Sequence, residues 1–101
     1  MTSKESPSGN IGTEVLQETD RVKVWELKLE PGESSEWHAH QNHYVFVVIE
    51  GGRLRAEYAD GGSGESESQP GDFSINQPST HRVTNTGSTT YRNIIVEIKG
   101  S

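Results

Sequence analysis

Three of the four histidines in this 101-residue chain lie within six positions, in the stretch WHAHQNH. His38 and His40 are two residues apart, so on an extended strand their side chains project from one face, together with Tyr44. His43 has the opposite parity and should point away, unless a bulge rotates it inward. The fourth histidine, His81, begins another predicted strand far along the chain. If the two strands are neighbours, His38, His40 and His81 converge.

Three neutral imidazoles on one face form a suitable site for a divalent first-row transition metal, with nitrogen-to-metal distances of about 2.0–2.1 Å for zinc. The spacing by itself also allows a plainer interpretation. In that interpretation His38 and His40 are polar residues entering a strand, and His81 is a turn residue. The choice between them depends on which strands become neighbours.

Apolar residues recur with a period of two, which is typical of strands rather than of amphipathic helices. In VKVWELKLE, for example, Trp25, Leu27 and Leu29 alternate with charged residues. No segment reads as a capped helix. The stretch 60–72, DGGSGESESQPGD, is predicted to be an exposed loop. We expect an all-β sandwich or small barrel with strands within 20–30, 36–50, 53–59, 73–76, 81–86 and 91–99.

The spacing around the clustered histidines resembles the first conserved motif of the cupin superfamily. Five residues separate Gly32 from His38, and one separates His38 from His40. Three residues then precede Tyr44, and six more precede Gly51. The position of Tyr44 is the one departure, because the family pattern usually has glutamate there.

The second cupin motif is also recognisable. The tripeptide 70–72, Pro-Gly-Asp, begins it, Pro78 precedes His81 by three residues, and Asn85 follows His81 by four. The family pattern usually places a glycine between the proline and the histidine, and this chain has none there. The two motifs and their flanking strands cover nearly everything after the first ten residues.

The chain therefore resembles small single-domain cupins of the Cupin_2-like conserved-barrel type. The resemblance implies a jelly-roll β-barrel, also called a double-stranded β-helix, over residues 11–99. It implies His38, His40 and His81 as ligands of a divalent metal such as Fe, Zn, Ni or Mn, and a homodimer. Residues 1–10 have no large apolar side chain after Met1, and we expect a disordered tail there.

Tyr44 stands where the family has a carboxylate ligand. A neutral phenol, with an ordinary pKa near 10, would not cancel any charge on the metal. We expect a three-histidine site of net charge near +2, with Tyr44 as a catalytic hydrogen-bond donor or general acid. An equally simple alternative makes Tyr44 a core aromatic residue whose hydroxyl is satisfied by the protein.

Other polar residues near the motifs have similar pairs of interpretations. Arg53 and Arg55 share a face just after the first motif and could grip a substrate carboxylate, or could form a solvated face with Glu57. Asn85 is expected to secure a turn rather than to contact substrate.

Composition narrows the function further. The net charge is −6 with no basic cluster, which argues against a nucleic acid or an anionic membrane as partner. No apolar run is long enough to cross a bilayer, and no signal peptide is recognisable. With no cysteine, thiolate ligands and disulfides are excluded. We expect a cytoplasmic protein.

Three functions remain. The first is a metal-dependent enzyme acting on a small organic acid or diketone, of dioxygenase type, or with isomerase, lyase or hydrolase chemistry at the same site. The second is a non-catalytic module that binds a small molecule or a metal. The third is a barrel that has lost its metal and serves as a structural dimer.

Overall fold

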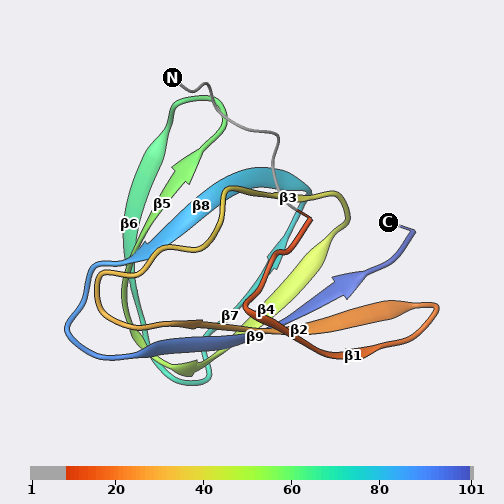
Figure 1. Ribbon diagram of the computed structural model, residues 1–101, viewed down its shortest axis with the longest axis horizontal. Helices are drawn as coiled ribbons and strands as arrows, with labels where there is room; N and C mark the ends of the chain where they lie inside the picture. Colours follow the sequence, from red (N-terminus) through yellow and green to blue (C-terminus); the bar gives the residue numbers. More distant parts are fainter. Residues whose placement is uncertain (1–8, 101) are drawn as a thin grey trace.

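The computed structural model describes residues 9–100, and in that part of the chain it contains nine strands and no helix (Figure 1). The predicted tail, 1–10, lies outside the described residues except for its last two. No helix between residues 9 and 100 is long and apolar enough to cross a membrane. The strands are β1 (Glu14–Glu18), β2 (Val22–Leu29), β3 (His38–His40), β4 (Tyr44–Glu50), β5 (Gly52–Tyr58), β6 (Ser63–Ser68), β7 (Phe73–Asn76), β8 (Ser79–Asn85) and β9 (Tyr91–Ile98).

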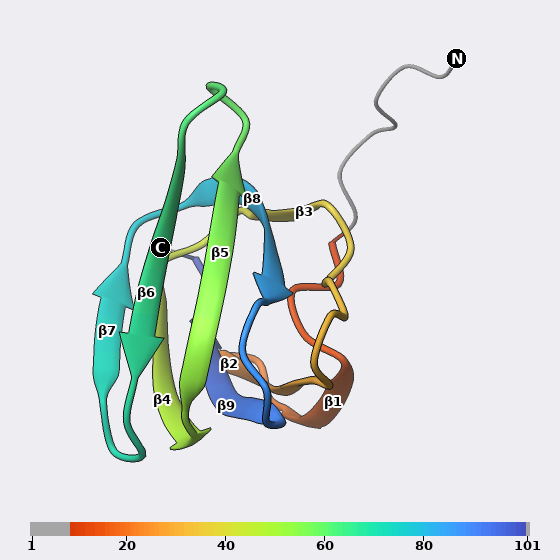
Figure 2. The same cartoon turned by 90° about the vertical axis from the view of Figure 1, so that its left-hand side faces the viewer.

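The strands form two antiparallel sheets that face each other across the interior, which confirms the all-β prediction. One sheet has five strands in the order β1-β2-β9-β4-β7, and the other has four in the order β3-β8-β5-β6. Figure 2 shows β5 and β6 side by side in front of the strands of the larger sheet. The two-residue alternation expected for half-buried strands is clearest in β2, where Trp25, Leu27 and Leu29 are buried.

The hydrophobic core lies on the inner face of the five-stranded sheet. Leu27 is paired in register with Asn93 of β9, and Phe46 of β4 with Ile95 of β9, so the inward residues of adjacent strands form continuous rows. The buried apolar side chains of the described residues are Ile11, Trp25, Leu27, Leu29, Tyr44, Val48, Tyr91 and Ile95.

The prediction of one long strand over 36–50 is wrong. The chain forms β3 in the smaller sheet, crosses at residues 41–43, and continues as β4 in the larger sheet. β3 pairs with β8, whereas β4 pairs with β9 and β7. The parity argument nevertheless holds, because the crossing spans three residues and the even-numbered positions face the interior on both sides of it. His38, His40 and Tyr44 are all buried.

The prediction of a loop over 60–72 is also wrong, because β6 occupies its centre. β6 pairs with β5 through a tight turn in which Gly61 has φ of 93° and donates its N–H to the carbonyl of Tyr58. The strand consists of serine, glutamate and glycine and is exposed along most of its length, so no hydrophobic alternation marks it. β1 is exposed throughout and likewise lacks a core-facing pattern.

Two residues of the sequence motifs have structural roles. A Cβ atom on Gly51 would clash with the carbonyl oxygen of Ser68, so the backbones can approach this closely only because the residue is glycine. Asn85 is fully buried, and its Nδ2 donates to the carbonyls of Leu29 and Thr89 at 2.8 Å each. Its Oδ1 accepts the N–H of Gly87 at 2.9 Å. Asn85 therefore secures the connection after β8, as predicted.

Candidate metal centre

Strand pairing brings the two distant parts of the histidine set together. β3 and β8 are antiparallel neighbours, with His38 directly opposite His81 and His40 opposite Ser79. Side chains of a directly opposed pair project from the same face, and His40 joins them because it is two residues from His38. The structure therefore brings His38, His40 and His81 into one group whose ligand atoms all lie within 4.8 Å of one another.

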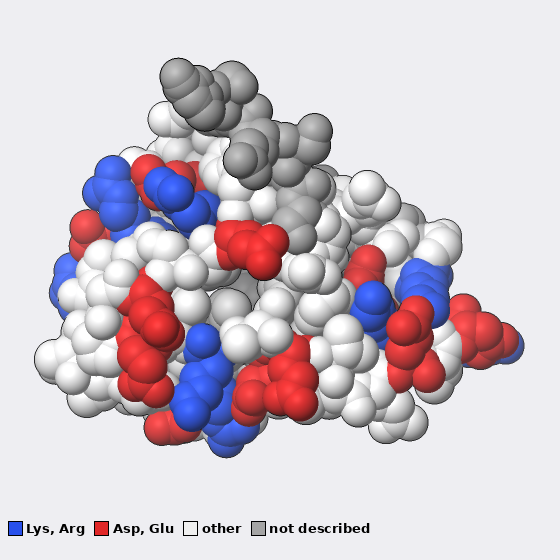
Figure 3. All heavy atoms as spheres, viewed as in Figure 1, with Lys and Arg blue, Asp and Glu red and all other residues white. Residues whose placement is uncertain are grey.

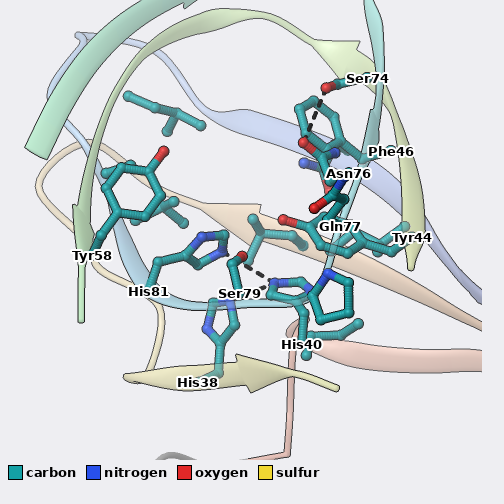
Figure 4. A pocket seen from close by; sticks show the side chains of 18 of the residues that line it. His38, His40, Tyr44, Phe46, Tyr58, Ser74, Asn76, Gln77, Ser79 and His81 are labelled. Carbon is teal, nitrogen blue, oxygen red and sulfur yellow. Dashed lines mark hydrogen bonds between the residues drawn. The ribbon is translucent and has the colours of Figure 1, made fainter. Parts of the chain in front are cut away.

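The three imidazoles form a nearly symmetrical triangle (Figure 4). Their ring centroids are 4.7 Å apart in every pair, and the ring planes are inclined to one another by 67° to 85°. The Nε2 atom of His40 lies 3.0 Å from Nε2 of His38 and 3.1 Å from Nε2 of His81. All three rings thus direct the same nitrogen toward a common point.

A backbone hydrogen bond determines the tautomer of His38. Its Nδ1 lies 2.7 Å from the carbonyl oxygen of Glu36, which can only accept, so Nδ1 is the protonated nitrogen. Nε2 of a neutral His38 therefore presents a lone pair to the other two rings. This is the arrangement by which a backbone carbonyl orients a metal-binding histidine.

These donors fit a transition metal ion. Two nitrogens that each lie about 2.1 Å from one ion are about 3.0 Å apart when they subtend an angle of about 90° at the ion. The Nε2 separations from His40 to the other two rings match that value. Lone pairs at this distance repel one another unless a cation or a proton lies between them, and imidazole nitrogens suit Zn, Cu, Fe and Ni.

Burial keeps the histidines in the neutral form that a metal requires. Desolvation, with a smaller contribution from His38 and His81, lowers the pKa of His40 to about 2. Desolvation, followed by the influence of His38, lowers the pKa of His81 to about 4. Burial also lowers the pKa of His38, although the hydrogen bond to the Glu36 carbonyl opposes this shift.

Tyr44 lies against the histidine group. Its ring stacks on the ring of His40 with centroids 3.8 Å apart and planes 19° from parallel. Its hydroxyl shares a hydrogen bond with the side chain of Ser79. Burial raises the pKa of Tyr44, with the Ser79 hydrogen bond opposing the shift, so the phenol is protonated at neutral pH.

The histidines border a cavity of about 420 Å³ between the two sheets. Figure 4 shows Tyr58 on one side of this cavity and Ser74, Asn76 and Gln77 on the other. The sequence interpretation did not place Ser74 or Asn76 at the site. Their parity within the short strand FSIN could have done so, because they alternate with the outward Phe73 and Ile75.

The remaining residues considered from sequence lie outside the site. His43 is exposed and does not belong to the histidine group. Arg53 and Arg55 are exposed on the outer face of the smaller sheet, where both pair with Glu65, at 3.1 and 3.8 Å. The surface interpretation of these arginines is therefore confirmed. On the face shown in Figure 3, basic groups lie beside acidic ones and do not gather into one patch.

The fold and the site together define a β-barrel protein with a candidate three-histidine metal centre. A family model described as Cupin_2, cupin domain, matches residues 25–97. The chain belongs to this cupin family. No curated protein matches the chain.

Solved structures agree with the family assignment. A cupin domain from Bordetella pertussis is 32% identical, with a TM-score of 0.79, over 96% of this chain and 100% of that one. A double-stranded β-helix protein from Klebsiella pneumoniae is 23% identical, with a TM-score of 0.72, over 95% of this chain and 84% of that one. A sugar phosphate isomerase of the cupin superfamily from Silicibacter pomeroyi is 20% identical, with a TM-score of 0.56, over 79% of this chain and 52% of that one. These similarities confirm the cupin fold.

Proposed function

We propose that this cupin binds one divalent transition metal through His38, His40 and His81 and is a metal-dependent enzyme. Its substrate would be a small chelating organic acid or diketone, and its chemistry of dioxygenase type. The single observation that supports the proposal most strongly is the convergence of three Nε2 atoms, 3.0 and 3.1 Å apart, at the edge of the cavity between the sheets. When bound, the metal would supply a Lewis acid with open positions for substrate oxygens and O2.

The protein side chains would supply orientation and hydrogen bonds. The backbone carbonyl of Glu36 holds the ring of His38 in place, and stacking on Tyr44 holds the ring of His40. If Ser79 donates in its hydrogen bond with Tyr44, the phenolic O–H is left available for an oxygen atom of a bound ligand. This is the catalytic role we propose for Tyr44.

A non-catalytic binding module is the second candidate function, and one specific observation favours it. No aspartate, glutamate, lysine or arginine is among the described residues that line the cavity. Apart from the three candidate ligands, the groups there with a proton to transfer are hydroxyls, and burial raises the pKa of Tyr44. A reaction that requires a carboxylate general base is therefore not supported by these walls.

Metal analysis tests the site itself. Protein purified without a histidine tag should contain close to one transition metal ion per chain after loading and desalting. The substitution His40→Ala should lower metal affinity by about 100-fold or more, since removing even a supporting partner of a ligand costs about 10–100-fold. The matched control is His43→Ala, which should bind metal like the unaltered protein. Equal metal content in all three proteins would contradict the proposed ligand set.

Oxygen consumption separates enzyme from binder. Protein loaded with Fe(II) should consume O2 in the presence of at least one member of a panel of β-diketones, hydroxy acids and thiols. If several compounds bind to the loaded protein and none is consumed, the binding module replaces the enzyme as the proposed function.

We also propose that the chain forms a homodimer through the outer face of the five-stranded sheet. Phe73 is 69% exposed and Ile75 is 73% exposed on its edge strand. Strand register places further apolar residues beside these two. We call the whole set the outer stripe: Phe73, Val47, Ile94, Ile75, Val45, Val96 and Val24. The charged residue that register places next to the outer stripe, Glu26 opposite Ile94, is paired with Arg92 at 2.6 Å, so two copies of a chain with net charge −6 would repel each other little there.

Sedimentation analysis tests the dimer. The double substitution Phe73→Ser with Ile75→Ser should convert it to a monomer, whereas Val15→Ser with Leu16→Ser, which changes exposed apolar residues on β1, should leave the dimer intact. A monomeric unaltered protein at micromolar concentration would refute this interface.

A further inference from the structure

The cavity next to the histidines has an unusual combination of polarity and charge. Its described lining includes serine, asparagine, glutamine and tyrosine side chains but no ionised group. The two arginines closest in sequence to the first motif are on the outer surface, where they pair with Glu65. Any ligand in this space therefore meets hydrogen-bonding groups and apolar surface, with positive charge only where the metal would be held.

Asn76 is the clearest unsatisfied group in this lining. It is paired in register with Tyr44, whose ring stacks on His40, so Asn76 lies beside the histidine end of the cavity. The hydroxyl of Ser74 donates to Oδ1 of Asn76 at 3.2 Å, which assigns the amide oxygen to Ser74. The Nδ2 atom of Asn76 is buried and has no hydrogen-bond partner among the described residues.

A second amide of the cavity lining, that of the buried Asn93, shows the same deficit. The Nδ2 atom of Asn93 donates to the hydroxyl of Tyr91 at 2.9 Å, whereas its Oδ1 is buried without a partner. Buried polar groups are nearly always hydrogen-bonded, and leaving one unpaired costs about 1–3 kcal/mol. Two residues of the cavity lining thus each hold one polar atom without a protein partner, a donor in Asn76 and an acceptor in Asn93, and a small rotation of either amide would turn that atom toward an occupant.

We infer that the ligand of this site is a small metal chelator whose remaining part is uncharged and polar, ending in an amide, hydroxyl or carbonyl group that Asn76 recognises. This inference rests on the proposed metal centre and adds the chemical class of the ligand. A carboxylate or phosphate at that end would lose part of its hydration against walls that carry no cation apart from the metal, and burying an unpaired charge is far more costly than burying a hydrogen-bonded amide. Asn76 is here a specificity residue, and Ser74 is a positioning residue that orients its amide.

Three hydroxamates with the same metal-binding head and the same two-methylene spacer provide the test. They end in a methyl, a carboxamide or a carboxylate group. Protein loaded with Co²⁺ is titrated with each, and the change in the visible absorption of the metal reports binding without any requirement for activity. We expect the carboxamide to bind at least about tenfold more tightly than the carboxylate.

Substitution of Asn76 identifies the residue responsible. Asn76→Leu should weaken binding of the carboxamide by about 3–10-fold, the loss of one hydrogen bond, and leave Co²⁺ affinity and binding of the methyl compound unchanged. Gln17→Leu is the matched control, because it removes an exposed amide on β1, away from the cavity lining. It should change none of these affinities.

The possible failures are distinguishable. Failure of the unaltered protein to bind Co²⁺ refutes the proposed metal function before any hydroxamate is added. If Co²⁺ binds but the carboxylate compound binds as tightly as the carboxamide, or no hydroxamate binds, the inferred ligand class is wrong. If Asn76→Leu weakens all three hydroxamates equally, Asn76 has a structural role and does not select the ligand.

Discussion

The two sheets of this barrel contribute very different side chains to the same interior. The strands of the five-stranded sheet provide every buried apolar side chain of the described residues except Ile11. The four-stranded sheet provides His38, His40 and Asn85, which are buried and polar, and its apolar residues Leu54 and Val83 are only partly buried. One sheet therefore forms most of the core, and the other holds the candidate metal centre.

This difference separates stability from function in the molecule. Removing buried apolar atoms loses transfer free energy and leaves a cavity, so the larger sheet should tolerate truncation poorly. The histidines are held by strand pairing and by the Glu36 carbonyl, and two of their Nδ1 atoms, in His40 and His81, are buried without a partner. The smaller sheet should therefore lose function more readily than fold.

A matched pair of leucines gives the largest expected effect on stability. Leu29→Ala, in β2, should lower the free energy of unfolding by about 2–5 kcal/mol, because the side chain is 4% exposed in the core cluster. Leu54→Ala, in β5, should cost less than half as much, since Leu54 is only partly buried. Urea unfolding of the metal-free proteins measures both. Equal losses would show that the two sheets share the core.

The buried asparagines are an exception to this contrast, because Asn85 of the smaller sheet is bonded on all sides and Asn93 of the larger sheet is not. Asn85→Leu should destabilise the protein by about 2–4 kcal/mol, because it leaves two carbonyls and one N–H without their side-chain partner. Asn93→Leu should change stability by less than about 1 kcal/mol, since the side chain of Asn93 donates a hydrogen bond to Tyr91 but has an unpaired Oδ1. Thermal or urea denaturation distinguishes them, and a comparable loss in both would assign Asn93 a structural role as well.

The histidine cluster should make the metal-free protein sensitive to mild acid. The pKa of His40, about 2, and that of His81, about 4, are below the ordinary value near 6.5. Between pH 6.5 and 5 the unfolded chain therefore takes up protons that the folded protein does not, and stability falls as pH falls. Each such histidine contributes a slope approaching about 1.4 kcal/mol per pH unit.

Urea unfolding at several pH values, with a chelator present, measures this slope. His40→Gln should reduce it by about 1.4 kcal/mol per pH unit. His43→Gln, at an exposed position outside the cluster, serves as the control and should retain the full slope. An unchanged slope in His40→Gln would mean that His40 is not kept neutral in the folded protein.

The smallest expected effect concerns the residue where the sheets meet. Tyr44→Phe should cost about 0.5–1.5 kcal/mol of unfolding free energy, the value of its hydrogen bond with Ser79, and should leave metal affinity unchanged. Tyr58→Phe is the control, because Tyr58 is 41% exposed, and its effect should lie within about 0.5 kcal/mol. A large loss of metal affinity in Tyr44→Phe would instead indicate that the phenol is a ligand.

Hydrophobic alternation was informative where one face of a strand is buried and uninformative elsewhere. It predicted the bounds of β2, β7 and β9 closely. In these strands, either the inward residues differ in polarity from the outward ones or a clear turn follows the strand. The alternation failed for β6, whose serines and glutamates are exposed on an edge strand held by backbone pairing with β5 and by ion pairs of Glu65 with Arg53 and Arg55. The division of 36–50 into β3 and β4 was missed, because no glycine or proline at 41–43 marks the point where the chain leaves one sheet for the other.

Sequence alone determined the all-β class, the cupin motifs and the shared parity of His38, His40 and Tyr44, because these depend on residue type and local spacing. The motif resemblance implied His81 as the third member of the group, but only the tertiary structure places it there, because its position opposite His38 results from pairing two strands that are distant in the chain. The tertiary structure also decided that Asn76 borders the cavity and that Arg53 and Arg55 do not. Which side of a strand faces the interior depends on what packs against it, and only the assembled sheets supply that information.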